Sequence, residues 1–456
     1  MTTGQRQLFG TDGIRGVAGE FPLTQQSTFL IGRAIGHDLI RANSQAVVVI
    51  GQDTRESSPW IADRVALGLR SAGASVDSAG VITTPGVAYL ARAGKYAAGI
   101  VISASHNPWT DNGIKVFSGE GYKLPDEREL AIEQEIFGLL QSSPAEPPMG
   151  AEPTLPGSGK LRRAYVEWLA SQVQQTALTK LRVLVDCANG AAAAEAPELF
   201  AAVGVDAVLL NATPNGRNIN ERCGALYPAT VAAEVARTAG FDLGVTFDGD
   251  ADRALFSDAT GRVVNGDGVL LLVARDMQTR GVLSGSTVVA TTMSNMGLEI
   301  ALRNSGIRML RANVGDKYVL EEMLKTGATL GGEQSGHIIF RDGDATTGDG
   351  LLTALRVMEI MVRSDKSLAE LVQDLKVFPQ IIKNIAVREK RPFDQVPSIQ
   401  EAIASAERKL GGNGRIVVRY SGTEALARVM VEAETEEKMR ALADRIAGAI
   451  KHVLGA

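Results

Sequence analysis

The stretch DLGVTFDGDADR, residues 242–253, decides the fold class, because an apolar run ends directly at three closely spaced carboxylates. The run Asp242–Phe247 has the length and apolar content of a buried strand. Asp248, Asp250 and Asp252 follow it at i, i+2 and i+4. Three like charges this close repel one another unless a cation lies among them, and carboxylate oxygens are ligands that Mg²⁺ prefers. The stretch therefore predicts a strand of an α/β sheet that leads into a metal-binding loop.

Two other interpretations of this acidic loop are weaker. An EF-hand calcium loop also begins with alternating acids, but it requires Gly at its sixth position and Glu at its twelfth. Those positions hold Arg253 and Ala259. A solvated acidic turn leaves the preceding buried strand unexplained. Arg253 itself is suited to neutralise the acids or to reach a phosphate.

Short β-branched runs alternate with helical patterns through most of the chain, which predicts α/β domains with mixed, mainly parallel sheets. The expected strands are residues 46–51, 98–103, 181–187, 205–210, 242–247, 286–290, 309–312, 329–332, 381–387, 415–420 and 428–434. The expected helices are residues 60–71, 126–140, 396–410 and a terminal helix to 453, with a hairpin at 113–124.

A chain of 456 residues is too long for one hydrophobic core, since a domain usually has about 100–200 residues. Residues 142–159 are rich in Pro, Gly and Ser and predict an exposed connection. The last block has fewer and longer elements, which predicts a smaller C-terminal α+β domain after three α/β domains. The predicted domains are residues 1–155, 156–258, 259–372 and 373–456.

Each of these blocks has a polar, glycine-containing loop after a predicted strand. The loops are SASHNP at 103–108, DGDADR at 248–253, GEQSGH at 332–337 and RYSGTE at 419–424. In parallel sheets, ligands gather beyond the carboxyl ends of the strands. One such loop per domain predicts a single central cleft at the domain junctions.

The loop at 103–108 supplies candidate nucleophiles in Ser103 and Ser105, with His106 beside them. A serine after a strand is more often a capping residue than a nucleophile, so this loop alone does not choose between the two serines. Lys115 is a candidate base if its pKa is lowered, although a lone lysine is usually a surface residue.

The loop at 419–424 is typical of a phosphate-binding turn. Ser421 and Thr423 offer hydroxyls, and Gly422 allows close approach of the backbone. Arg419 and Arg428 can hold phosphate oxygens in bidentate fashion. A hairpin turn without a ligand is the alternative interpretation.

Two further loops offer polar side chains for a phosphosugar. The segment TDGIRG, residues 11–16, makes Arg15 available for a phosphate. In GEQSGH, Glu333, Ser335 and His337 suit the hydroxyls of a sugar, although a structural turn explains them nearly as well.

Composition excludes several functional classes. The formal net charge of −5, from 47 basic and 52 acidic residues, gives no reason to expect a nucleic-acid partner or a membrane surface. The polar first ten residues do not predict a secretory signal. Two cysteines, Cys187 and Cys223, predict neither a disulfide scaffold nor a zinc site, which favours a reducing cytoplasm.

These loops, in this order, closely resemble the α-D-phosphohexomutase superfamily, nearly from end to end. The motifs that carry the resemblance are LFGTDGIRG at 8–16, GIVISASHNPWTDNGIKVF at 99–117, VDCANGA at 185–191, SNMGLE at 294–299, TTGDG at 346–350 and RVMVE at 428–432. Within the superfamily, the chain is most similar to bacterial members that act on glucosamine phosphates. Gln334 fits this group, because relatives that act on glucose or mannose phosphates commonly carry Met there.

The resemblance implies an isomerase that interconverts glucosamine 6-phosphate and glucosamine 1-phosphate for cell-wall precursor synthesis, through a phosphoserine and a hexosamine 1,6-bisphosphate. It implies that Ser105 carries the phosphoryl group and that a Ser105 oxygen, Asp248, Asp250 and Asp252 bind Mg²⁺. Lys115, as the proton acceptor, would line the transfer site with His106 and Arg253. The implied substrate-binding residues are Arg15, Glu333, Ser335, His337, Arg419, Ser421, Gly422, Thr423 and Arg428. Members of the superfamily vary in oligomeric state, so a homodimer is compatible with the resemblance.

Two departures from the family pattern are present. Ala251 stands where the family usually has Gly, and a positive φ there would cost on the order of 1 kcal/mol without removing a ligand. Ala425 replaces the Pro of SGTEP, and Ala427 replaces a larger aliphatic residue. The alternatives are a mutase acting on glucose or mannose phosphates by the same chemistry, and a catalytically silent sugar-phosphate sensor.

Overall fold

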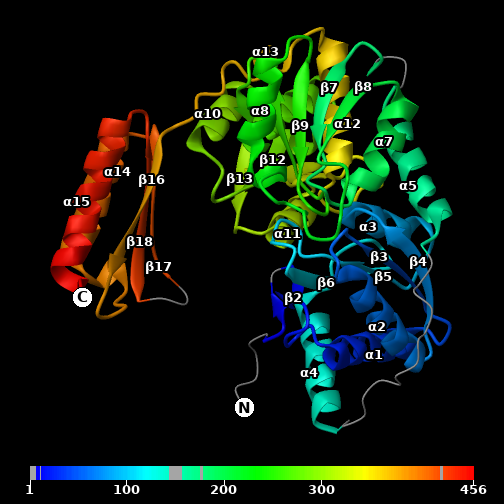
Figure 1. The fold of residues 1–456 in the computed structure, drawn as a ribbon. Helices are drawn as coiled ribbons and strands as arrows, with labels where there is room; N and C mark the ends of the chain where they lie inside the picture. Colours follow the sequence, from blue (N-terminus) through cyan, green and yellow to red (C-terminus); the bar gives the residue numbers. More distant parts are fainter. Residues whose placement is uncertain (1–6, 11, 143–156, 175–177, 422–424) are drawn as a thin grey trace. The chain divides into compact units, whose positions relative to one another are not determined.

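The computed structural model describes residues 7–10, 12–142, 157–174, 178–421 and 425–456, whose strands form four sheets (Figure 1). Most of the connection expected at 142–159 falls outside these residues. The first three sheets belong to one compact unit, Met1–Met293 with Met309–Val372. The fourth sheet belongs to a second unit, Ser294–Arg308 with Gln373–Ala456.

The first sheet has the strand order β1-β2-β6-β5-β3-β4. Its strands are β1 (Phe9–Gly10), β2 (Gly13–Val17), β3 (Val47–Gln52), β4 (Ser75–Val81), β5 (Ala98–Ile102) and β6 (Asp111–Ser118). The prediction of a hairpin at 113–124 is wrong for most of that stretch. Strand β6 is buried on both faces and pairs antiparallel with β2 and β5, and only a tight turn before Lys123 folds back on Phe117.

The helices of the first domain cover both faces of this sheet. They are α1 (Gln25–Ala42), α2 (Ser58–Ser71), α3 (Thr84–Ala93) and α4 (Asp126–Ser142). Val48, Ile50 and Ile100, which alternate along their strands, join the core shared with α1, α2 and α4. Helix α3 covers the other face and packs against β3 and β5.

The second sheet has the order β11-β10-β9-β7-β8. Its strands are β7 (Arg182–Asp186), β8 (Asp206–Leu210), β9 (Leu243–Phe247), β10 (Ala254–Asp258) and β11 (Val263–Val264). Its helices are α5 (Gly159–Ser171), α7 (Ala192–Val203) and α8 (Pro228–Arg237). The buried strand expected before the acidic loop is therefore β9, and the sequence did not predict β10 on the other side of that loop.

The third sheet has the order β13-β12-β14-β15. Its strands are β12 (Thr287–Thr291), β13 (Arg308–Ala312), β14 (Leu330–Gly332) and β15 (Ile338–Phe340). Its helices are α9 (Gly266–Thr279), α11 (Asp316–Thr326), α12 (Gly350–Ser364) and α13 (Leu368–Leu371). Short 3₁₀ turns occur in the chain at Gly224–Leu226, Ser284–Ser286 and Phe393–Gln395.

The three sheets are mixed, as expected, and the parallel pairs lie at one edge of the first two sheets and at the centre of the third. Strand β3 pairs in parallel with β4 and β5, β7 with β8 and β9, and β12 with β14. The strands after the serine and acidic loops, β6 and β10, instead return antiparallel beside β5 and β9. Each of these two loops therefore joins adjacent strands of its sheet.

The second unit holds a small antiparallel sheet with the order β16-β18-β17. Its elements are α10 (Met296–Asn304), β16 (Gln380–Ala386), α14 (Pro397–Leu410), β17 (Gly414–Tyr420), β18 (Leu426–Ala433) and α15 (Glu436–Leu454). Apolar side chains of α14 and α15, including Ile399 and Ile446, form one core with the sheet. This unit confirms the smaller α+β domain. Among the described residues, no helix combines the length and apolar character needed to cross a bilayer.

Candidate functional site

The acidic loop, residues 248–253, brings its three carboxylates together between β9 and β10. One oxygen from each of Asp248, Asp250 and Asp252 lies within 4.8 Å of the others, and all three residues are buried. Within the described part of the chain, Asp250 Oδ1 and Asp252 Oδ1 are buried without a hydrogen-bond partner. Burial raises the pKa of Asp248 well above its usual range, and Asp252 and Asp250 raise it further. Orphaned carboxylate oxygens in a group this close fit a divalent cation.

The serine loop, residues 103–108, places Ser105 against this acidic group. Ser105 Oγ lies 2.5 Å from Asp248 Oδ2 and 3.2 Å from His106 Nδ1. Ser103 has a different position, because its Oγ accepts a 2.9 Å hydrogen bond from the backbone N–H of Ser105. The structure therefore brings Ser105, and not Ser103, to the acidic loop. Burial and the nearby Arg253 and Arg15 lower the pKa of His106 to about 4.

Lys115, on β6, lies beneath the pocket among carboxylates. Its Nζ is 2.8 Å from Asp250, 2.9 Å from Asp12 and 3.5 Å from Asp252. Burial alone would lower the pKa of Lys115, but these three acids raise it well above the usual range. The candidate role of Lys115 as a base required a lowered pKa, whereas the three acids raise its pKa. The geometry suits a fixed cation that neutralises the acidic loop.

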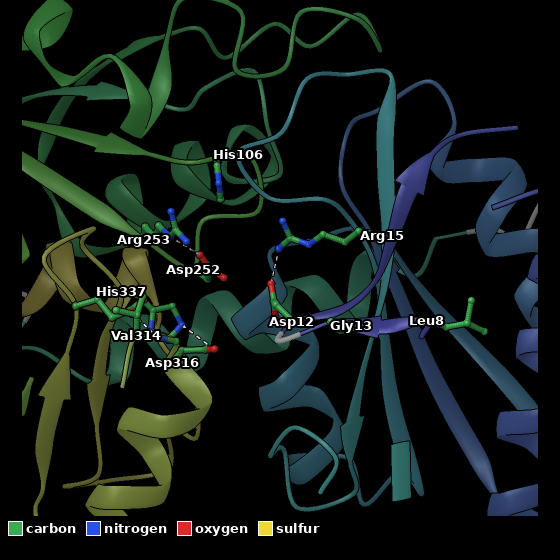
Figure 2. A pocket seen from close by; sticks show the side chains of 13 residues that line it. Leu8, Asp12, Gly13, Arg15, His106, Asp252, Arg253, Val314, Asp316 and His337 are labelled. Atoms are coloured by element: carbon green, nitrogen blue, oxygen red, sulfur yellow. Dashed lines mark hydrogen bonds and ion pairs between the residues drawn. The ribbon is translucent and has the colours of Figure 1, made fainter. Parts of the chain in front are cut away.

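A pocket of about 410 Å³ opens beside the two loops. It is lined by Leu8, Gly10, Asp12, Gly13, Arg15, His106, Asp252, Arg253, Val314, Gly315, Asp316, Glu333 and His337. Figure 2 shows His106, Arg253 and Asp252 on one side of this pocket and Arg15 with Asp12 on the other. Of the predicted residues, Ser105, Lys115, Asp248 and Asp250 do not line the pocket and are buried.

The GEQSGH loop contributes Glu333 and His337 to the pocket. Glu333 Oε1 accepts a 3.0 Å hydrogen bond from the backbone of Gly315, and Ser335 Oγ lies 3.5 Å from Glu333 Oε2. His337 Nε2 is 3.5 Å from Asp316. Gln334 does not line the pocket, and its Nε2 donates to Asp267 at 3.2 Å. The carboxylate of Glu333 and the imidazole of His337 at the pocket wall are suited to sugar hydroxyls, and Ser335 lies behind Glu333 without lining the pocket.

Several site residues were not predicted from the sequence. Asp12 accepts from Arg15 and Lys123 at 2.5 Å each, and Lys123 also pairs with Asp316. Thr84, at the start of α3, donates its hydroxyl to Asp250 Oδ2 at 2.5 Å. Arg55 donates to backbone carbonyls of the serine loop. Arg55 lies in a polar run directly after the predicted strand 46–51, so the strand-end rule could have found it, and Asp12 lies in the polar loop 11–16 that also holds Arg15. Nothing in the sequence marks Thr84 or Lys123.

The C-terminal unit carries the predicted phosphate-binding residues. Arg419 on β17 lies directly opposite Arg428 on β18. Like charges at facing positions of two strands repel, and an anion between them would relieve that repulsion. The Ser421 backbone N–H donates to Leu426 O at 2.8 Å, which closes the hairpin. Gly422 and Thr423 lie outside the described residues.

Comparisons with known proteins divide the chain into the same four parts. Models of the phosphoglucomutase/phosphomannomutase family match residues 6–142 (α/β/α domain I), 163–261 (domain II), 265–378 (domain III) and 382–449 (C-terminal domain). A phosphoglucosamine mutase from Koribacter versatilis is 63% identical, over 99% of this chain and 98% of the relative. One from Solibacter usitatus is 52% identical, over 99% of each chain.

Solved structures of similar proteins have the same fold. A phosphoglucomutase/phosphomannomutase family protein from Burkholderia thailandensis has a TM-score of 0.79 at 26% identity, covering 98% of this chain and 97% of its own. An Aspergillus fumigatus N-acetylphosphoglucosamine mutase, solved with GlcNAc-6P and magnesium, has a TM-score of 0.63 at 19% identity, covering 99% and 96%. The second likeness supports the fold alone. From its sequence relatives and family domains, the chain belongs to the phosphoglucomutase/phosphomannomutase family, whose members are phosphohexose mutases.

Proposed function

We propose that this protein is a phosphoglucosamine mutase that interconverts glucosamine 6-phosphate and glucosamine 1-phosphate. The observation that carries the proposal is the 2.5 Å contact between Ser105 Oγ and Asp248, at a buried group of three acids beside a polar pocket. The choice of the amino sugar is supported by the relatives at 63% and 52% identity, which carry that name.

In this proposal the acidic loop holds Mg²⁺. The ligands would be Asp248, Asp250, Asp252 and an oxygen on Ser105, which the orphaned carboxylate oxygens and the Ser105 contact support. When bound, the ion neutralises negative charge on the phosphoryl group that is transferred. Lys115 neutralises part of the negative charge of the acidic loop through Asp250 and Asp252.

The chemistry moves one phosphoryl group off Ser105 and another back. The bond between Ser105 Oγ and phosphorus breaks, and a new bond forms from phosphorus to the C1 hydroxyl oxygen of glucosamine 6-phosphate, whose proton passes to a base. The resulting 1,6-bisphosphate turns around, the bond between its O6 and phosphorus breaks as a bond from phosphorus to Ser105 Oγ forms, and the base returns the proton to O6. We assign the base to His106, which lines the pocket, ahead of the buried Lys115.

The remaining pocket residues bind and orient the substrate. Arg15 and Arg253 line the pocket from opposite sides (Figure 2), and we assign to them the binding of the transferred phosphoryl group. Glu333, Ser335 and His337 hold sugar hydroxyls. The second phosphate belongs to the C-terminal loop, through Arg419, Ser421, Gly422, Thr423 and Arg428, and the facing arginines support this assignment.

Intact-protein mass spectrometry tests the proposed nucleophile. Incubation of the Mg²⁺-loaded protein with a hexose 1,6-bisphosphate should add one phosphate to the wild type and to Ser103→Ala, and none to Ser105→Ala. A phosphate on Ser105→Ala would move the nucleophile elsewhere. A wild type that binds Mg²⁺ and gains no phosphate would favour a silent sugar-phosphate sensor.

Substrate competition tests the sugar. Turnover of glucosamine, glucose and mannose 6-phosphates should favour the amino sugar, and equal turnover of the three would favour a mutase for glucose or mannose phosphates.

The proposed domain limits remain 1–155, 156–258, 259–372 and 373–456, and the nearby bounds of the four family matches support them. We further propose a cytoplasmic location, which two buried, unpaired cysteines support.

A further inference from the structure

Two side chains from different domains converge on the backbone of the serine loop. Arg55, in the first domain, donates Nη2 to Ser105 O at 3.0 Å and to Asn107 O at 2.7 Å. Asn220, in the second domain, donates Nδ2 to the same two oxygens at 2.9 and 3.1 Å. Each carbonyl therefore has two donors, one from each domain.

These bonds hold Ser105 in a backbone conformation that serine seldom adopts. Its φ is 51°, in the left-handed region, which is strained for a residue with a Cβ. The N–H of Ser105 is fixed by Ser103 Oγ, and its carbonyl is fixed by Arg55 and Asn220. With both peptide groups fixed, the direction of the Cβ is fixed as well. The hydroxyl is thereby aimed at Asp248.

Both donors are themselves held in place. The Arg55 side chain is fully buried and pairs with Asp53, which also accepts from the hydroxyl of Ser58 at 2.7 Å. A planar guanidinium presents its donors in a rigid geometry, so one group can serve two carbonyls. Asn220 also has a positive φ, 58°, which Asn tolerates better than most residues.

The acidic loop closes against the same carbonyl. A Cβ added at Gly249 would lie 2.5 Å from Ser105 O and 2.9 Å from Asn220 Nδ2. Only glycine leaves room for this approach. The carbonyl oxygen of Ser105 is therefore the point at which the two donors and the acidic loop meet the serine loop.

We propose that Arg55 and Asn220 are positioning residues that hold Ser105 in its left-handed conformation and so set the direction in which its hydroxyl points. Neither residue lines the pocket, so both act through the serine loop. The inference rests on the proposed role of Ser105 as the phosphoryl carrier. The alternative is that the two side chains only join the first and second domains.

Two variants and one control test the inference. Asn220→Gly removes one donor and accepts a positive φ without strain. Arg55→Lys keeps the charge but loses the planar fork. The control is Thr54→Val, because Thr54 Oγ1 donates to Asn189 O at 2.6 Å and so joins the same two domains without contacting the serine loop. The assays are kcat and KM, calorimetric Mg²⁺ affinity, the rate at which a hexose 1,6-bisphosphate phosphorylates Ser105, and melting temperature.

We expect kcat and the phosphorylation rate of Asn220→Gly to fall together by about 10–100-fold, since a small misplacement of a reacting atom has effects of this size. KM should stay within about threefold of wild type, and Thr54→Val should keep both its kcat and its Mg²⁺ affinity. A folded Asn220→Gly protein with wild-type kcat, or a loss shared equally by Thr54→Val, would overturn the inference. Arg55→Lys should show the same loss of kcat if the protein folds. If Arg55→Lys does not fold, Asn220→Gly alone decides the test. A wild type that takes up no phosphate would refute the proposed function instead, independently of these variants.

Discussion

The hydroxyl of Thr84 offers a direct test of how the acidic loop is assembled. Thr84 Oγ1 donates to Asp250 Oδ2 at 2.5 Å, and the Thr84 backbone N–H donates to Asp250 O at 3.0 Å. Thr84 is buried, and it belongs to the first domain whereas Asp250 belongs to the second. Thr84→Val removes the hydroxyl, keeps the shape of the side chain, and leaves the backbone hydrogen bond in place.

The size of the effect follows from the bond that is lost. A hydrogen bond to a charged group contributes roughly 1.5–3 kcal/mol, and losing a partner that orients a metal ligand typically lowers metal affinity about 10–100-fold. At about 1.4 kcal/mol for each factor of ten, the two ranges agree. We therefore expect the Kd of Thr84→Val for Mg²⁺ to rise by about 10–100-fold.

Titration calorimetry on EDTA-treated, dialysed protein measures this Kd. Thr84→Ser is the matched control, because it restores the hydroxyl on a smaller side chain and should bind Mg²⁺ close to wild type. A Thr84→Val protein whose Kd stays within about twofold of wild type would show that the hydroxyl does not orient Asp250. Equal weakening of the Ser and Val variants would assign the effect to packing.

Three further perturbations test other parts of the molecule. Burial raises the pKa of Glu195 to about 8, so the folded state binds the proton more tightly than the unfolded state, and stability falls as pH rises from about 4.5 to 8. Melting curves should show that Glu195→Gln is more stable than wild type at pH 8, with a smaller gap at pH 5. Ala251→Gly should shift the melting temperature by less than about 3 °C, because relief of about 1 kcal/mol of left-handed strain is offset by about 0.8 kcal/mol of lost methyl burial. A larger rise in the melting temperature would mean that strain dominates. Arg419→Ala should raise KM by about 10–100-fold through loss of a charge-assisted pair, and an unchanged KM would remove Arg419 from phosphate binding.

The strands that the sequence predicted are rich in apolar and β-branched residues, and the boundaries of two fully buried ones are close to those observed. Strand β5 begins at the expected residue and ends one residue early, and β9 begins one residue late. Strand β10 was missed because it follows the acidic loop without a turn signal, and β6 was read as a hairpin because its glycine and asparagine imitate one. Such strands depend on the neighbours with which they pair, and those neighbours lie far away in the sequence.

The functional site also has parts that the sequence predicts and parts that it does not. The close approach of Asp248, Asp250 and Asp252 follows from their spacing, and the structure confirms it. The choice between Ser103 and Ser105 does not follow from spacing, because both come directly after one strand. The neighbours of Lys115 do not follow from the sequence, because Asp12 lies about a hundred residues earlier in the chain and comes close to Lys115 only in the folded protein.

Positive φ angles gather where the serine and acidic loops meet, and this clustering indicates how the site is built. Ser105, Ala251 and Asn220 have φ angles of 51°, 54° and 58°. Ser105 is held by Arg55 and Asn220, and Ala251 O accepts from the backbone of Gly350, at the start of α12 in the third domain. Strained residues persist only where the surrounding structure fixes them from several sides. Because those sides belong to three domains, the geometry around Ser105 is a property of the assembled α/β domains and not of any single loop.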